Sequence, residues 1–379
     1  MTAGDEELET KAPKFHIDRS AYADRFATWL DSQWPAASQI TVTDVDIPVA
    51  TGFSNETVFL TVHWIEDGVG HEQRMVARIE PTSAAIFPTQ TEHTGVSVGL
   101  QFQIMDAVAR NSDVPITPLI AYEPDPEVVG QPFFLMEFVN GVIPADQPRY
   151  SQEGFLVDDA TPQQRRRMIE SGLEAMAGIH AIDWRQAGLE WLDPTGGNPT
   201  QADQLAIYRE MVVSELAGRE HPVLMAALDW LDANDPNDDR IGLTWGDARL
   251  GNIIWQDYEA AAVVDWEACA LSPTEADVGW WLMFDRMSFD DLDAERMEGF
   301  PTREEMVAIY EASSGKEVRD PHYWEVFATM RFCAIFIRLG DRMVGHGLLP
   351  ESMNPAVGNQ VTDALAALLE MENPTPNVL

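Results

Sequence analysis

Residues 245–267, WGDARLGNIIWQDYEAAAVVDWE, decide the fold of this chain of 379 residues. Two short apolar runs in this stretch are separated by the polar tetrapeptide at 256–259, a pattern typical of a β-hairpin. Because a hairpin brings its two ends together, Asp247, Asn252 and Asp265 are expected to converge at one end of it. The stretch therefore predicts a cluster of two carboxylates and one amide.

This cluster has the composition that phosphoryl transfer from a nucleotide requires. One carboxylate orients the attacking hydroxyl, while an amide oxygen and a second carboxylate bind Mg²⁺ on the phosphates. The order acid, basic residue, Asn, hairpin, acid is that of the catalytic and metal-binding loops of protein kinases. We therefore predict that Asp247 accepts or orients the proton of the acceptor, and that Asn252 and Asp265 are ligands of Mg²⁺. If these residues only formed turns or caps, the hairpin and the second acid at this distance would be a coincidence.

The same residues carry a resemblance to a known family. WGDARLGN at 245–252, followed by VDWE at 264–267, resembles the signature of the aminoglycoside phosphotransferase-like family, whose usual form is HGDxxxxN and then DWE or DxG. The chain is most similar to the branch with GDxRxGN, which includes kinase-like domains fused to acyl-CoA dehydrogenases. The resemblance extends from about Asp44 to the C-terminal helices. It implies an α+β, protein-kinase-like fold with a five-stranded N-lobe containing one helix and a mostly helical C-lobe.

The periodicity of apolar residues agrees with this architecture. We expect an N-terminal tail and helix at 1–38, an N-lobe at 39–140, and a helical C-lobe with the catalytic loop at 141–379. The pattern predicts N-lobe strands at 40–50, 57–65, 74–79, 116–122 and 133–139, a helix at 18–34 and a second helix at 100–109. It predicts C-lobe helices at 162–182, 204–216, 223–233, 275–286, 304–313 and 322–343.

The resemblance also implies a phosphate site in the N-lobe. Gly52 and Ser54, between the first two strands, would present backbone amides and a hydroxyl to phosphate oxygens, although neither GxGxxG nor a P-loop motif is present. Kinases place a cation on the third strand to contact the phosphates. The chain has no lysine between Lys14 and Lys316, so this cation would be Arg78, whose guanidinium can bind phosphate through two hydrogen bonds.

The usual acidic partner of that cation is missing. Gln101 aligns with its position on the N-lobe helix, and it can only donate or accept a hydrogen bond. Arg78 would therefore lack an ion pair unless Glu92, from the preceding loop, reaches it.

The last N-lobe strand, 133–139, resembles a kinase hinge. By this resemblance, the backbone C=O of Glu137 and the N–H of Val139 would bind the edge of adenine, and Met136 would lie at the back of the pocket.

Four further residues surround the catalytic loop. Arg249 occupies the place of the lysine that contacts the transferring phosphate in protein kinases. Trp245 replaces the usual His, so its supporting contacts must differ. Glu267 would face the acceptor or the metal, and Asp277 would brace the catalytic loop.

The charge of the chain excludes several classes of partner. Asp and Glu total 63 against 24 Lys and Arg, which gives a net charge of −39 at pH 7. Such a surface repels nucleic acid and anionic membranes, and it is typical of adaptation to a salty cytoplasm. The acidic N-terminal residues do not resemble a secretion signal, and no window of about 18 apolar residues is present, so we expect a cytoplasmic location. Cys269 and Cys333 are expected to be buried hydrophobes.

We therefore expect ATP- and Mg²⁺-dependent phosphorylation of a hydroxyl group on a small molecule. Acyl-CoA-like, amino-alcohol and sugar hydroxyls all fit, and a polycationic aminoglycoside is a minority option. The alternative is a nucleotide-binding pseudokinase that acts as a regulatory module, which Gln101 and Trp245 favour and the complete set of catalytic-loop oxygens opposes. A protein kinase is a third option, against which stands the absence of an APE motif and of a long activation segment after Asp265.

Overall fold

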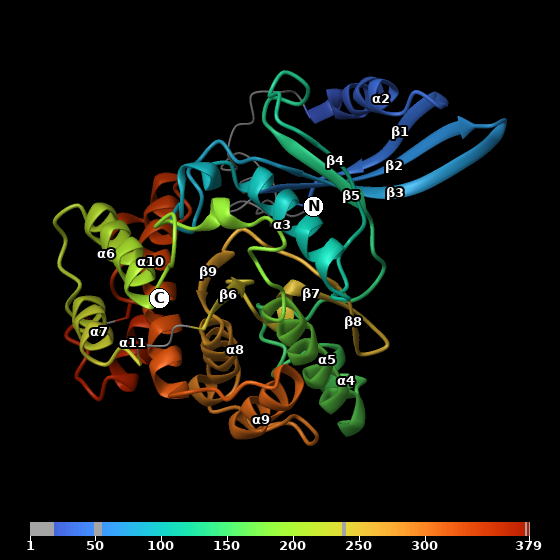
Figure 1. The fold of residues 1–379 in the computed structure, drawn as a ribbon. Helices are drawn as coiled ribbons and strands as arrows, with labels where there is room; N and C mark the ends of the chain where they lie inside the picture. The colour runs from blue at the N-terminus through green and yellow to red at the C-terminus, as the bar shows by residue number, and fades with distance from the viewer. Residues whose placement is uncertain (1–18, 49–54, 237–239, 376, 379) are drawn as a thin grey trace.

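The computed structural model describes residues 19–48, 55–236, 240–375, 377 and 378. Its first part is a five-stranded antiparallel sheet with the strand order β1-β2-β3-β5-β4 (Figure 1). The strands are β1 (Ala37–Asp46), β2 (Glu56–Glu66), β3 (Val69–Ile79), β4 (Leu119–Glu123) and β5 (Phe133–Glu137). This confirms the five predicted strands. The third begins at Val69 rather than at 74, because its pairing with β2 continues up to the tight turn at Asp67.

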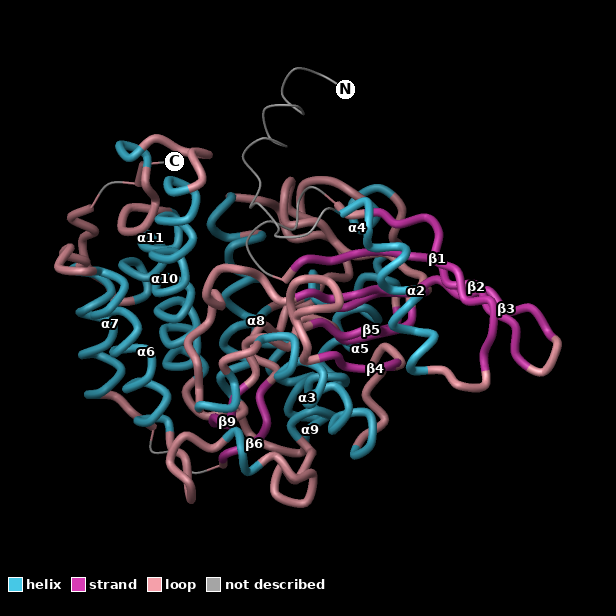
Figure 2. The backbone as a smooth tube through the Cα atoms, turned by 90° about the horizontal axis from the view of Figure 1, so that it is seen from above, coloured by secondary structure: helices cyan, strands magenta, loops and turns pink. Residues whose placement is uncertain are grey.

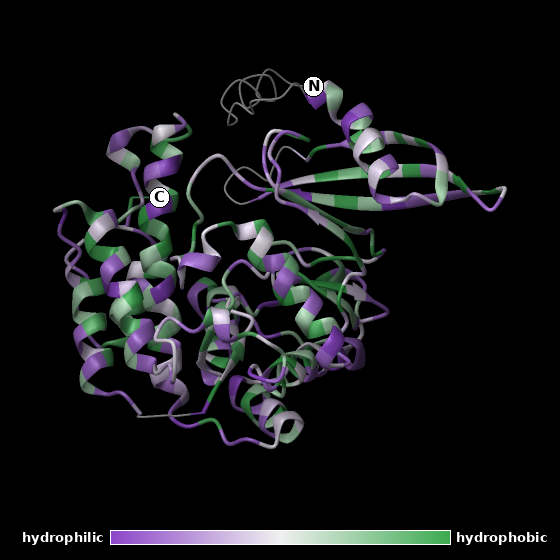
Figure 3. Cartoon of the chain, turned by 45° about the horizontal axis from the view of Figure 1, so that its top comes forward, coloured by the Kyte–Doolittle hydropathy of each residue, from purple (hydrophilic) through white to green (hydrophobic). Residues whose placement is uncertain are grey.

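The sheet has two buried faces. Alternate residues of β2, β3 and β5 form one apolar core with α2 (Tyr22–Gln33), the predicted N-terminal helix. Phe26 and Trp29 of α2 pack edge-on against Phe133, with ring centroids 5.3 and 4.7 Å apart. The intervening residues face the opposite side, toward α3 (Ser97–Asn111) and the rest of the chain. Figure 3 shows this alternation of hydrophobic and hydrophilic residues along the strands.

The remainder of the chain is mostly helical, with α6, α7, α10 and α11 gathered on the side away from β1, β2 and β3 (Figure 2). The helices are α4 (Phe155–Asp158), α5 (Pro162–His180), α6 (Gln201–Leu216), α7 (Pro222–Ala233), α8 (Glu275–Ser288), α9 (Arg303–Ser314), α10 (Pro321–Gly345) and α11 (Gln360–Leu368). The six predicted helices of this part correspond to α5 through α10, to within three residues at each end. The sequence pattern did not predict α4 or α11. The chain is thus an α+β protein, as expected.

Two small antiparallel sheets lie within the helical part. The predicted hairpin is formed by β7 (Ile253–Gln256) and β8 (Glu259–Val263). A second pair, β6 (Ile241–Thr244) and β9 (Ala270–Pro273), was not predicted. Since β6 precedes the catalytic loop and β9 follows the hairpin, their pairing holds both ends of the 245–267 stretch.

One segment crosses from the sheet side to the helical side. Residues 84–91, which we call the strap, lie between β3 and α3. Arg338 of α10 donates through Nη1 to the carbonyl oxygen of Ala85 at 2.8 Å. Gln204 of α6 donates to Oε1 of Gln90 at 2.8 Å. The strap therefore ties the sheet side to two helices of the other part.

Within the described ranges, no helix combines the length and the apolar character needed to cross a membrane.

Candidate active site

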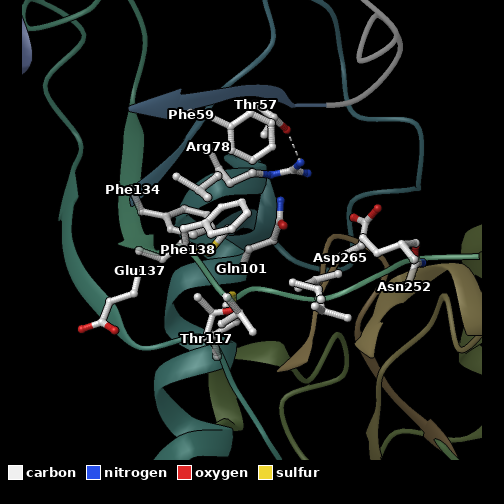
Figure 4. Close-up of a pocket in the computed structure, with 18 of the residues that line it drawn as sticks. Thr57, Phe59, Arg78, Gln101, Thr117, Phe134, Glu137, Phe138, Asn252 and Asp265 are labelled. Atoms are coloured by element: carbon white, nitrogen blue, oxygen red, sulfur yellow. Dashed lines mark hydrogen bonds between the residues drawn. The ribbon is translucent and has the colours of Figure 1, made fainter. Parts of the chain in front are cut away.

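A cleft of about 310 Å³ lies between the sheet and the hairpin β7–β8 (Figure 4). This volume is at the lower end of the range typical of small-molecule sites, about 300–1,000 Å³. Phe134 and Met136 of β5 contribute apolar walls, and Glu137 lies at one end. Asn252 and Asp265 lie at the opposite end (Figure 4). The cleft is thus apolar at one end and rich in oxygen ligands at the other.

Asp247 is held by donors from two separate elements. Nδ2 of Asn252 donates to Oδ2 of Asp247 at 2.7 Å and to its backbone oxygen at 3.0 Å. The indole Nε1 of Trp280, on α8, donates to Oδ1 of Asp247 at 2.7 Å. These contacts fix the carboxylate of a residue that is only 8% exposed. The convergence of Asp247 and Asn252 is as predicted, whereas the contribution of Trp280 was missed.

Arg249 bridges two carboxylates. Its Nε lies 3.2 Å from Oδ1 of Asp247, and its Nη1 donates to both carboxylate oxygens of Asp146 at 2.8 and 2.7 Å. Its guanidinium also lies 5.1 Å from the ring centroid of Phe284. Asp146 was not singled out by the sequence, because nothing in the order of residues links it to the catalytic loop.

Asp265 has an unsatisfied oxygen. It adopts a left-handed backbone conformation with φ of 61°, which a short polar side chain tolerates. Its Oδ1 is buried, with no hydrogen-bond partner in the described part of the chain. Burial raises the pKa of the Asp265 carboxyl above its ordinary value, and the positive charge of Arg78 opposes this shift. A buried carboxylate oxygen without a partner is costly, so this position is suited to a cation.

The catalytic loop is braced from α8. Oδ2 of Asp277 accepts a hydrogen bond from the backbone N–H of Trp245 at 2.6 Å, and Oδ1 accepts one from that of Gly246 at 2.8 Å. Nε2 of His180 lies 2.9 Å from Oδ2 of Asp277, and Nδ1 of His180 lies 2.8 Å from the hydroxyl of Tyr310. All of these groups are buried. The predicted bracing role of Asp277 is therefore confirmed.

Gly246 is required at its position. It has φ of +88°, and a Cβ added there would lie 2.0 Å from the carbonyl oxygen of Ala268. Its own carbonyl oxygen accepts a hydrogen bond of 2.9 Å from Nη2 of buried Arg331. Trp245, in place of the usual His, donates from its indole to the carbonyl oxygen of Val264 at 3.0 Å. The indole thereby joins the start of the catalytic loop to the end of the hairpin.

Arg78 and Gln101 are not joined by a hydrogen bond in the described structure. Nη1 of Arg78 donates to Oγ1 of Thr57 at 2.7 Å (Figure 4). Nε2 of Gln101 donates to Oγ of Ser97 at 3.2 Å. Glu92 does not reach Arg78 either. Its side chain is 88% exposed and lies 3.7 Å from His93 in a short 3-10 turn, which leaves it in solvent.

The other residues predicted to bind the nucleotide form two groups. Met136, Glu137 and Val139 all line the cleft. Gly52 and Ser54 lie outside the described residues.

Glu267 is not part of the cleft lining. It borders a separate narrow hollow together with Tyr208 and Cys269. Both cysteines are buried free thiols, as expected.

Comparison with known proteins gives a consistent picture. The model of the phosphotransferase enzyme family matches residues 46–309. A protein of Arabidopsis thaliana named as acyl-CoA dehydrogenase IBR3 is 26% identical over 337 residues, which are 82% of this chain and 39% of that protein. Acyl-CoA dehydrogenase family member 10 of Mus musculus is 26% identical over 277 residues, 70% of this chain and 24% of that protein. The chain thus spans well under half the length of these relatives.

Solved structures agree on the fold. A protein from Ralstonia eutropha JMP134 named as an aminoglycoside phosphotransferase superposes with a TM-score of 0.66 at 22% identity, over 92% of this chain and 95% of that one. Macrolide 2′-phosphotransferase MphH from Brachybacterium faecium superposes with a TM-score of 0.53 at 17% identity, over 94% of this chain and 99% of that one. A thermostable mutant of aminoglycoside phosphotransferase APH(4)-Ia, in a ternary complex with ADP and hygromycin B, superposes with a TM-score of 0.51 at 13% identity. The superposition covers 91% of this chain and 97% of that one.

These similarities establish the kinase-like architecture expected from the sequence. The family model covers more than half of the chain and includes both the catalytic loop and the hairpin. The chain therefore belongs to the phosphotransferase enzyme family.

Proposed function

We propose that this protein transfers the terminal phosphoryl group of ATP to a hydroxyl group of a small molecule, with Mg²⁺ as cofactor. The observation that carries the proposal is the arrangement of Asp247, Asn252 and Asp265. The first two are joined by a hydrogen bond of 2.7 Å, and the third presents a buried, unsatisfied oxygen. Asn252 and Asp265 line the same end of one cleft.

The cleft supports nucleotide binding along its length. At its apolar end the backbone C=O of Glu137 and the N–H of Val139 would bind the adenine edge, with Met136 beside the ring. At its polar end Arg78 would contact the phosphates, since its guanidinium lines the cleft and is held there by a neutral hydroxyl. In this proposal the loop with Gly52 and Ser54 would cover the phosphates.

The residues at the polar end fit a magnesium ion. Asn252 uses its amide nitrogen to bind Asp247, which leaves its amide oxygen for a cation, beside the unsatisfied Oδ1 of Asp265. The described residues contain no group of three or more His, Cys, Asp or Glu that could hold a metal. A site with few protein ligands suits Mg²⁺, which takes its remaining ligands from phosphates and water. When bound, it would neutralise charge on the transferring phosphoryl group.

Asp247 would orient the acceptor hydroxyl and take up its proton. Its two oxygens already accept hydrogen bonds from Trp280 and Asn252, so the carboxylate enters the reaction in a fixed orientation. Arg249 would contact the transferring phosphoryl group. It is held by Asp146 as well as by Asp247, and both partners keep its charge close to the reacting atoms.

The side chains around Asp247 support an acceptor with an apolar part. The ring of Phe284 lies 5.1 Å from the guanidinium of Arg249 and 5.9 Å from that of Arg149. The half-buried ring of Phe332 continues this surface at 5.5 Å from Phe284. Because Arg249 is already paired with Asp146 and Asp247, its charge does not select an anion, and the two aromatic rings favour an acceptor with an apolar part.

The proposal is tested by measuring nucleotide binding and turnover on the same preparations. Calorimetry with ATP should give binding that strengthens with Mg²⁺ in the wild type and loses its metal dependence in Asp265→Ala. A panel of sugars, amino alcohols, hydroxy acids and aminoglycosides is then tested for ATP-dependent phosphorylation. Binding without turnover of any acceptor would favour the pseudokinase alternative. Failure of the wild type to bind ATP would overturn both.

A further inference from the structure

The helix α3 needs an anchor other than the one usual in kinases. An acid on this helix normally pairs with the cation on the third strand, and this pair links the position of the helix to the phosphates. Here Gln101 occupies that place and is 2% exposed. Its amide donates to Ser97, one turn earlier on the same helix, and makes no hydrogen bond to Arg78 within the described residues.

The N-terminus of α3 cannot cap itself. The first N–H groups of a helix have no acceptor inside the helix and require one from elsewhere. The residue at the N-cap position is Val96, whose side chain has no oxygen, and no capping bond from it is found. The carboxylate of Glu80 supplies acceptors for two of these N–H groups. Its Oε1 lies 3.0 Å from the backbone nitrogen of Ser97, and its Oε2 lies 2.8 Å from that of Val98.

Glu80 is itself fixed to the sheet. It directly follows β3, and its backbone N–H donates to the carbonyl oxygen of Pro132 at 2.9 Å, next to the start of β5. Because side chains alternate along an extended chain, Glu80 and Arg78 point to the same side. A negative charge at the positive end of the helix dipole adds to the two hydrogen bonds. The link from β3 to α3 therefore starts two residues after Arg78 and does not use it.

We propose that Glu80 is the positioning residue for α3, in place of the acid that would pair with Arg78. Under the proposed function, this leaves the guanidinium of Arg78 available for phosphates whether or not α3 moves. The N-terminus of the helix is then fixed to the sheet without Arg78, and nucleotide binding does not reorder it. Ser97 supports the arrangement, since its hydroxyl also accepts a hydrogen bond of 3.2 Å from buried Asn55, just before β2.

Hydrogen exchange of the 379-residue chain tests the anchor without any nucleotide. Glu80→Ala should speed exchange of the first-turn amides of α3 by about tenfold, the usual size of a lost N-cap, and Glu80→Gln, which keeps one acceptor oxygen, should give a smaller effect. Glu92→Ala is the matched control, because Glu92 is exposed near the same helix, and it should change nothing. Unchanged exchange in Glu80→Ala would overturn the proposal.

A second measurement separates positioning from general destabilisation. Glu80→Ala should weaken ATP binding several-fold and raise the KM for ATP more than it lowers kcat. Adding Gln101→Glu, which restores the usual acid opposite Arg78, should recover ATP affinity in the Glu80→Ala background. Failure of this rescue would count against the positioning role. If the wild type binds no ATP, the proposed function fails, while the exchange result still decides the role of Glu80. Saturating ATP should leave α3 exchange unchanged in the wild type; strong protection would contradict the proposal.

Discussion

The indole of Trp280 and the carboxylate of Asp247 are joined by a hydrogen bond of 2.7 Å between Nε1 and Oδ1. Trp280 lies in the middle of α8 and is 1% exposed. The guanidinium of Arg331, on α10, lies 4.6 Å from the Trp280 ring centroid. A buried helix therefore holds the carboxylate in the orientation that the proposed reaction needs.

Trp280→Phe should lower kcat by about tenfold, because a hydrogen bond to a charged group is worth about 1.5–3 kcal/mol and phenylalanine keeps the packing without the donor. The affinity for ATP should stay unchanged. Steady-state kinetics with ATP and an identified acceptor check this. Wild-type kcat in the variant would show that Asn252 alone orients Asp247.

Asp247→Asn should lower turnover by about two orders of magnitude or more, as expected for the loss of a positioned base. Nucleotide binding should remain nearly intact, since Asp247 does not line the described cleft. Calorimetry with ATP provides the control for folding and binding. Activity within a few-fold of the wild type would mean that Asp247 has only a structural role.

Arg78→Ala should weaken ATP binding by about tenfold, in line with the loss of a charge-assisted hydrogen bond. Arg78→Lys should keep much of the activity, because a positive charge near the phosphates matters more than the geometry of the guanidinium. Thr57→Val, which removes only the neutral partner of Arg78, is the matched control. Normal ATP binding by Arg78→Ala would point to Arg249 as the phosphate contact.

His221 should contribute to the loss of stability in mild acid. Its ring caps α7, with Nδ1 accepting a hydrogen bond of 3.3 Å from the backbone N–H of Leu224, and burial lowers its pKa to about 4. The His221 ring takes up a proton near pH 6.5 in the unfolded chain, but only near pH 4 in the folded chain. The contribution of His221 to the free energy of unfolding is therefore at its maximum above pH 6.5. It falls between pH 6.5 and 4, by roughly 3 kcal/mol at most.

The comparison of wild type with His221→Asn isolates this effect, because asparagine is also a good N-cap. Urea denaturation at pH 7 and pH 5 should show a smaller drop in the free energy of unfolding for the variant. His93→Asn serves as the control, since the His93 side chain is 60% exposed. Equal drops in wild type and His221→Asn would rule out His221 as the titrating group.

The net charge of −39 should make stability depend on salt. The Debye length falls from about 30 Å at 0.01 M salt to about 3 Å at 1 M, so repulsion between surface acids is screened. The Tm should therefore rise with KCl up to molar concentrations, and activity should rise with it. NaCl should give the same rise, because screening depends on ionic strength and not on which monovalent cation is present. A Tm that is flat between about 0.05 and 2 M KCl would contradict salt adaptation.

The sequence predicts best those parts whose signals are local. The hairpin β7–β8 was evident from two apolar runs around a polar turn, and the convergence of Asp247 with Asn252 follows from it. The pair β6–β9 was missed because each strand has only four residues and the partner lies beyond the hairpin. The helix α11 carried a usable signal, since Asn359 caps it and apolar residues follow at helical spacing.

The rest of the site depends on contacts that periodicity does not report. A helical pattern groups Trp280 with apolar residues but does not show which group its indole contacts, and it gives no sign that Arg331 is buried. The role of Glu80 was hidden for the same reason, because its partners are backbone amides that any sequence would supply. The missing acid opposite Arg78 was visible in the sequence, whereas its replacement required the positions of β3 and α3.

The strap gives the two halves of the molecule a second point of attachment. On one side of the cleft the segment that follows β5 runs beside β7, where Val142 and Trp255 exchange backbone hydrogen bonds of 2.9 Å in both directions. On the other side the strap is fastened to α6 and α10 (Figure 1). Attachments on both sides of the cleft restrict the relative motion of the two parts mainly to rotation about the line that joins these attachments. Any widening of the cleft for entry or exit of a ligand would then occur through this one rotation.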